Sequence, residues 1–224
     1  MKAILFDMDG TLLDSMAMWH HLEIEFLQDL GVDTEAVDYA ELLTLGLDQT
    51  LELIEDRFGI TASARDIETF VDKRMEDFYR DEVQIFPGVV KTLEALKQKA
   101  IPMGVGTATN EEHAHIALES SGLLNYFDFV YSTSTDGHAK DNPAFFEEAA
   151  KRFPAEAEDI VLFDDAYYAL TTAKKVGYYV VGVKDEGYNQ DLDAIRNIAD
   201  ETLVTFEDLD VDEWLEKVNY NDYA

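Results

Sequence analysis

The sequence contains no cysteine among its 224 residues, which excludes disulfide bonds and metal sites built on thiolates. It also has no apolar run approaching the roughly 18 residues of a membrane span. Asp7 and Asp9 interrupt the first apolar stretch, so a signal peptide is not predicted. We therefore expect a soluble protein of the cytoplasm.

Positive charge is scarce, since 17 Lys and Arg residues stand against 48 Asp and Glu residues and give a formal net charge of −31. A field of this sign repels nucleic acid and anionic membrane surfaces, and neither is expected as a partner. A site for a phosphorylated ligand would have to supply positive charge locally, from a metal ion, a lysine or backbone N–H groups.

Strands and helices alternate over most of the chain, and 47% of the residues are apolar. Residues 3–6 read as a buried strand. Further strands are predicted at 102–107, 127–131, 159–163, 178–183 and 201–205. Helices are predicted at 89–98, 111–121, 143–153, 167–176 and 211–218. This alternation predicts an α/β fold with a doubly wound, Rossmann-like parallel sheet and helices on both faces.

Residues 15–83 have a different character, because they show amphipathic helical patterns without a strand pattern. Since a strand precedes them and others follow, they are predicted to form a helical-bundle cap inserted into one α/β domain. The expected domains are a catalytic core of residues 1–14 and 84–224 and a cap of residues 15–83. Hinges are expected near residues 14–15 and 84–88.

Polar side chains follow four of the predicted strands: Asp7 and Asp9, then Thr107 and Thr109, then Lys140 in the next loop, and finally Asp164 and Asp165. In doubly wound sheets, ligands bind outside the carboxyl ends of the strands. Crowded carboxylates are explained by a cation between them, although aspartates also cap helices and form turns. The joint pattern favours a reactive site, with Asn110 expected to cap the following helix.

These residue types suit phosphoryl transfer to a carboxylate. Such chemistry needs a nucleophilic aspartate, a Mg²⁺ ion with oxygen ligands, hydroxyl and lysine donors for the phosphoryl oxygens, and a second carboxylic acid for the leaving oxygen. The sequence contains a candidate for each role.

Four motifs in this order resemble those of the haloacid dehalogenase superfamily. They are FDMDGTL at 6–12, Thr107, Lys140 with Pro143, and FDD at 163–165 followed by Gly177. The helical insertion before FPG at 86–88 resembles the phosphatase branch that carries a helical cap and includes phosphoglycolate phosphatase and β-phosphoglucomutase.

The resemblance implies a role for each residue. Asp7 would be the nucleophile that forms an aspartyl-phosphate, and Asp9 the acid/base. Thr107 and Lys140 would hold the phosphoryl group. Mg²⁺ would be bound by Asp7, the backbone carbonyl of Asp9 and Asp165, with Asp164 acting directly or through water. The expected activity is hydrolysis of a small phosphorylated metabolite; the sequence does not report the oligomeric state.

The fourth motif departs from the family pattern, because Ala166 stands in place of a serine and Ala169 in place of a glycine. In the third motif, Ala139 replaces the usual glycine before the lysine. Loss of the serine hydroxyl removes one hydrogen bond around the metal site. Every catalytic group is present, so activity is expected.

Two alternatives stay open: a phosphosugar mutase of the β-phosphoglucomutase type, and a catalytically silent binding protein of the same fold. A mutase needs basic residues in the cap to bind a second phosphate. Leu45 and Gln49 stand where lysine and arginine would be expected. Trp19 stands near the position where those mutases carry a histidine. A phosphorelay receiver domain is excluded by the order of the motifs. The presence of Asp9 disfavours a dehalogenase.

Overall fold

The computed structural model describes residues 1–33, 47–184 and 192–221. It divides into two compact units, Met1–Met16 with Tyr79–Ala224, and Ala17–Phe78. The division falls close to the predicted limits of the insertion, whose role as a cap stays a prediction. Residues 44–46 of the predicted cap loop, Leu45 included, lie outside the described residues, and the side chain of Gln49 is not described either. No helix within the described ranges is long and apolar enough to cross a membrane.

The larger unit is built on a six-stranded sheet whose spatial order is β5-β4-β1-β6-β7-β8. Its strands are Ala3–Phe6 (β1), Met103–Thr107 (β4), Phe129–Ser132 (β5), Ile160–Asp164 (β6), Tyr179–Val183 (β7) and Glu201–Leu203 (β8). Every neighbouring pair is parallel. The predicted parallel α/β sheet is confirmed, with strand ends displaced by one or two residues.

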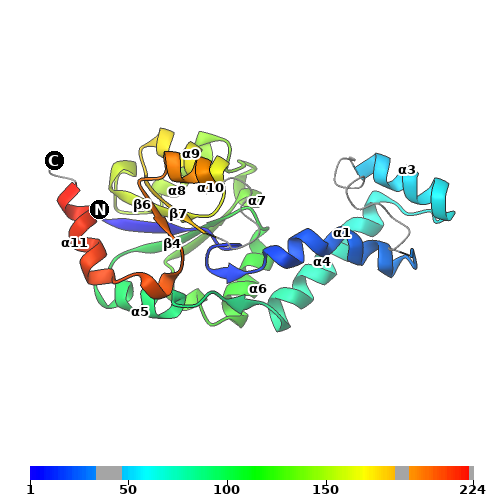
Figure 1. Cartoon of the computed structure of the whole chain (residues 1–224), viewed down its shortest axis with the longest axis horizontal. Coiled ribbons are helices and arrows are strands. Elements are labelled where there is room, and N and C mark those ends of the chain that lie inside the picture. Colours follow the sequence, from blue (N-terminus) through cyan, green and yellow to red (C-terminus); the bar gives the residue numbers. More distant parts are fainter. Residues whose placement is uncertain (34–46, 185–191, 222–224) are drawn as a thin grey trace. The chain divides into compact units, whose positions relative to one another are not determined.

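Helices cover both faces of the sheet (Figure 1). On one face lie Pro143–Ala150 (α8), Tyr167–Val176 (α9) and Leu192–Ile198 (α10). On the other lie Val89–Gln98 (α5), Glu111–Ser120 (α6) and Val211–Asn221 (α11). A short helix, Thr133–Asp136 (α7), follows β5. The doubly wound arrangement is therefore as predicted.

Strand β1 is central because its side chains are apolar on both faces. Leu5 packs in one core cluster with Phe145 and Leu170, from α8 and α9. On the opposite face the ring of Phe6 stacks on Phe163 with centroids 5.1 Å apart. All four residues of β1 are fully buried. Burial of such side chains stabilises by roughly 1.5–3 kcal/mol each, so the end of β1 is a rigid support for whatever follows it.

A two-stranded antiparallel pair, Leu13–Asp14 (β2) and Gln84–Ile85 (β3), was not predicted. Leu13 pairs with Ile85 where the chain leaves the larger unit and returns to it. Two-residue strands are too short to show an alternating pattern, which explains the omission.

The smaller unit is helical in its described residues, as predicted. Helix Met16–Asp29 (α1) enters it, Leu47–Phe58 (α3) lies within it, and Ala64–Asp81 (α4) leaves it. Its core contains Phe26 and Ile54, and the Phe26 ring meets Phe70 edge-on with centroids 5.4 Å apart. Trp19 is half-buried.

Candidate active site

The predicted site residues meet at one edge of the sheet. Asp7 follows β1, Thr107 ends β4 and Asp164 ends β6. Strand β1 lies between the other two, and Phe6 is in register with both Val105 and Phe163. Because the three strands are parallel, their carboxyl ends lie side by side, as the sequence predicts.

Lys140 connects two of these strand ends. Its Nζ donates to Asp7 Oδ1 at 2.6 Å and to Asp164 Oδ2 at 2.7 Å, and all three side chains are buried. Burial raises the pKa of Asp7 to about 7, although Lys140 opposes the change. Burial lowers the pKa of Lys140, but the charges of Asp164 and Asp7 outweigh it and the net shift is upward. Lys140 is therefore a buried ammonium group held between two carboxylates.

Asp165 adds a third carboxylate. Within the described residues, ligand oxygens of Asp7, Asp164 and Asp165 all lie within 4.8 Å of one another. Burial and the neighbouring charges of Asp7 and Asp164 raise the pKa of Asp165. Three clustered carboxylates exceed the single charge of Lys140, and hard oxygen ligands of this kind suit a divalent cation such as Mg²⁺.

Gly10 allows the turn after β1 to lie against Asp165. Its φ is +78°, and a Cβ built there would stand 2.7 Å from Asp165 Oδ2. The Thr11 hydroxyl lies 3.5 Å from Asp165 Oδ1. Glycine is thus required both by the backbone conformation and by the close approach of the carboxylate.

Asp9 belongs to a separate hydrogen-bond network. Its Oδ1 accepts from the hydroxyls of Ser15 at 2.6 Å and Tyr79 at 2.7 Å, and its Oδ2 accepts from Thr109 at 2.6 Å. Neither Ser15 nor Tyr79 was predicted as a site residue from the sequence. A buried tyrosine at the end of an amphipathic helix reads as core, and its sequence carries no signal for this contact.

The loop after β4 has a defined shape. Thr107 is buried, and its hydroxyl oxygen accepts from the Thr109 N–H at 3.1 Å, which leaves the hydroxyl proton for another acceptor. Asn110 caps α6, as predicted, because its Oδ1 accepts from the His113 N–H at 2.8 Å.

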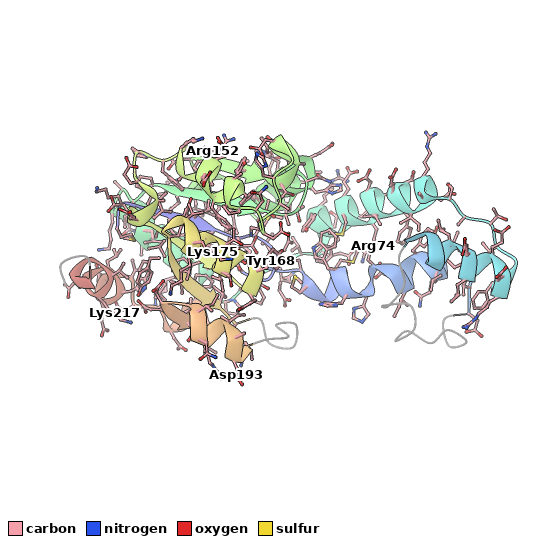
Figure 2. All side chains as sticks on the ribbon, turned by 90° about the horizontal axis from the view of Figure 1, so that it is seen from above. Arg74, Arg152, Tyr168, Lys175, Asp193 and Lys217 are labelled. Atoms are coloured by element: carbon pink, nitrogen blue, oxygen red, sulfur yellow. The ribbon has the colours of Figure 1, made fainter. Side chains whose placement is uncertain are left out.

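Two exposed aromatic side chains, Tyr167 and Tyr168, stand in the first turn of α9, directly after Asp165 and Ala166. Tyr168 is labelled in Figure 2. Burial of its hydroxyl raises the pKa of Tyr168. The charge of Lys140 opposes this rise, and the charge of Asp164 adds to it. The Tyr168 side chain is half-exposed and follows Asp165 by three positions along the chain.

The family model for haloacid dehalogenase-like hydrolases matches residues 4–183, and the chain belongs to this family. A probable phosphatase from Dickeya dadantii is 30% identical over 192 residues, 80% of each chain. A phosphoglycolate phosphatase from Rhodobacter capsulatus is 28% identical over 88% of this chain and 90% of its own length.

Solved structures agree in fold. The crystal structure of a β-phosphoglucomutase-like protein from Thermotoga maritima superposes with a TM-score of 0.76 and 22% identity, over 92% of this chain and 95% of the other. The match to the family model confirms the resemblance to the haloacid dehalogenase superfamily inferred from the four motifs.

Proposed function

We propose that the protein is a Mg²⁺-dependent phosphatase that hydrolyses a small phosphomonoester through an aspartyl-phosphate on Asp7. The observation that carries this proposal is the bridge from Lys140 to Asp7 and Asp164, with Asp165 beside it. Relatives of the chain are named as phosphatases, and those names support the same reaction class.

Asp7 is the proposed nucleophile because Lys140 occupies its Oδ1 and leaves Oδ2 to attack. The bond from Asp7 to phosphorus forms as the bond from phosphorus to the leaving oxygen breaks. Lys140 and the Thr107 hydroxyl hold phosphoryl oxygens during this transfer. Asp9 donates a proton to the leaving oxygen.

The second step regenerates Asp7. Asp9, now ionised, takes a proton from a water molecule that attacks phosphorus. The bond from phosphorus to Asp7 breaks, and inorganic phosphate leaves with Asp7 and Asp9 in their starting forms. Atoms and protons balance over the two steps.

The cluster fits a magnesium ion, because the carboxylates of Asp7, Asp164 and Asp165 converge within 4.8 Å. Burial raises the pKa of Asp7 and of Asp165, and a cation between them would offset the cost of ionising both. Asp7, the backbone carbonyl of Asp9 and Asp165 would hold the ion. Asp164 would support it indirectly, since its two oxygens already accept from Lys140 and from the Ala166 N–H at 2.8 Å. When bound, Mg²⁺ supplies positive charge between the Asp7 carboxylate and the incoming phosphate.

The test is a phosphate-release assay on a panel of sugar phosphates, phosphoglycolate and nucleotides, with Mg²⁺ and with EDTA. The proposal predicts release that depends on Mg²⁺ and is lost in Asp7→Asn. Full activity of Asp7→Asn would contradict it. Conversion of β-glucose 1-phosphate to the 6-phosphate faster than phosphate release, with a bisphosphate primer, would favour the mutase alternative.

A further inference from the structure

Three hydroxyl groups from separate parts of the chain surround the carboxylate of Asp9. Ser15 and Tyr79 donate to Oδ1 at 2.6 Å and 2.7 Å, and Thr109 donates to Oδ2 at 2.6 Å. These lengths are typical of hydroxyl donors on a carboxylate. Because both oxygens are engaged, rotation of the Asp9 carboxylate about its Cβ–Cγ bond would break all three hydrogen bonds.

Tyr79 is held in place by contacts of its backbone and of its ring. It is fully buried in the last turn of α4 and belongs to the larger unit. Its backbone carbonyl accepts from Ser120 Oγ, and its ring lies 6.3 Å from the imidazole of His113; both partners are on α6. With its backbone held by Ser120 and its buried ring beside His113, Tyr79 has few torsions left, so the direction of its hydroxyl is set by the fold.

The chain also contains a buried tyrosine of the ordinary structural kind. Tyr178 is almost fully buried and donates to the backbone carbonyl of Phe146 at 2.9 Å. Its ring packs edge-on against Phe146, with centroids 5.6 Å apart, in the core beneath α8. Tyr79 differs in that its hydroxyl is directed at the acid/base carboxylate.

We propose that Tyr79 is a positioning residue for Asp9, holding its carboxylate in the orientation that meets the leaving oxygen of the substrate. The inference rests on the proposed function and extends it to a residue at the end of the helical insertion. A general acid contributes roughly 10²–10⁴-fold, but only when it lies within hydrogen-bond reach of the leaving group. Without the Tyr79 hydroxyl, Oδ1 keeps one donor and the carboxylate gains rotational freedom.

The experiment compares Tyr79→Phe with the wild type on two esters of similar size, p-nitrobenzyl phosphate and 2,4-dinitrophenyl phosphate. The benzyl alkoxide needs a proton as it leaves, whereas the dinitrophenolate does not. The value of kcat/KM reports only the transfer to Asp7, so slow breakdown of the intermediate does not mask the effect. We expect kcat/KM to fall about 10- to 100-fold for the benzyl ester and less than about threefold for the dinitrophenyl ester.

The ratio of the two kcat/KM values is independent of the folded fraction, so partial misfolding does not obscure the result. Tyr178→Phe is the matched control, since it removes a buried tyrosine hydroxyl away from Asp9, and its ratio should equal that of the wild type. Asp9→Asn should shift the ratio in the same direction and further than Tyr79→Phe.

An unchanged ratio in Tyr79→Phe, with both esters still hydrolysed by the wild type, overturns the positioning role and leaves the proposed function standing. Failure of the wild type to release phosphate with Mg²⁺ from both esters and from the panel of phosphorylated metabolites overturns the proposed function, and the role of Tyr79 falls with it.

Discussion

Gly10 shows how one residue links the backbone to the charged cluster. Its φ of +78° is one that L side chains rarely adopt, and the space for a Cβ is occupied by the Asp165 carboxylate. Gly122, after α6, has a similar φ of +74°, but a Cβ added there would meet nothing within 4 Å. Comparing substitutions at the two glycines therefore distinguishes the cost of the left-handed backbone from the effect of displacing Asp165.

Replacing either glycine by alanine should cost about 1–2 kcal/mol of stability through the left-handed backbone. Only Gly10→Ala should also displace Asp165 and weaken Mg²⁺ binding, by about tenfold or more. Thermal unfolding and titration calorimetry with Mg²⁺ measure the two effects. Equal Mg²⁺ affinity in Gly10→Ala and Gly122→Ala would show that Asp165 is not a ligand.

For individual residues, the sequence predicts the site residues that belong to motifs and misses those that reach the site through packing. Asp7, Asp164 and Lys140 were identified from their places after strands, and the structure brings them within hydrogen-bond distance. Tyr79 lies 70 positions from Asp9 along the chain. Its hydroxyl reaches Asp9 because of how α4 ends, and no local pattern encodes that geometry.

Among the elements, those with long apolar runs or clear caps were predicted well. The limits of α5 and α9 agree with the prediction, since Gly88 precedes α5 and Gly177 ends α9 in the left-handed conformation. The pair β2–β3 could not be predicted, because each strand has two residues and its pairing partner is distant in sequence.

The cap of α6 has a measurable consequence. Asn110→Ala removes the acceptor for the His113 N–H and should lower stability by about 1 kcal/mol. Asn110→Asp keeps an acceptor and should stay near the wild type. Chemical denaturation of the three proteins measures the difference. A stability of Asn110→Ala equal to that of the wild type would show that the cap contributes nothing.

For the molecule as a whole, burial of the Asp7 carboxylate beside other charged groups links the stability of the fold to pH. Asp7 has a pKa raised from 3.8 to about 7, so between these values the folded protein binds more protons than the unfolded chain. Stability without metal should therefore fall as pH rises through this window. Asp66 and Asp136 have pKa values lowered below 3.8, so their contribution to stability rises with pH. This rise lies below the pH window of Asp7.

Without metal, the melting temperature should accordingly be higher at about pH 6 than at about pH 8. Mg²⁺ competes with the proton on Asp7, so the rise in melting temperature on adding Mg²⁺ should be larger at the higher pH. Differential scanning fluorimetry at fixed ionic strength measures both. In Asp7→Asn the pH dependence should be reduced; an unchanged dependence would assign it to other groups.

The central claim is that Asp7 carries the phosphoryl group during turnover. It is tested most directly by acid-quenching the protein during hydrolysis of p-nitrophenyl phosphate with Mg²⁺, reducing the acyl phosphate with borohydride, and analysing the peptides by mass spectrometry. Because this leaving group departs readily, the intermediate should accumulate. We predict that Asp7 is recovered as homoserine in the wild type; turnover without any modification of Asp7 would contradict the account.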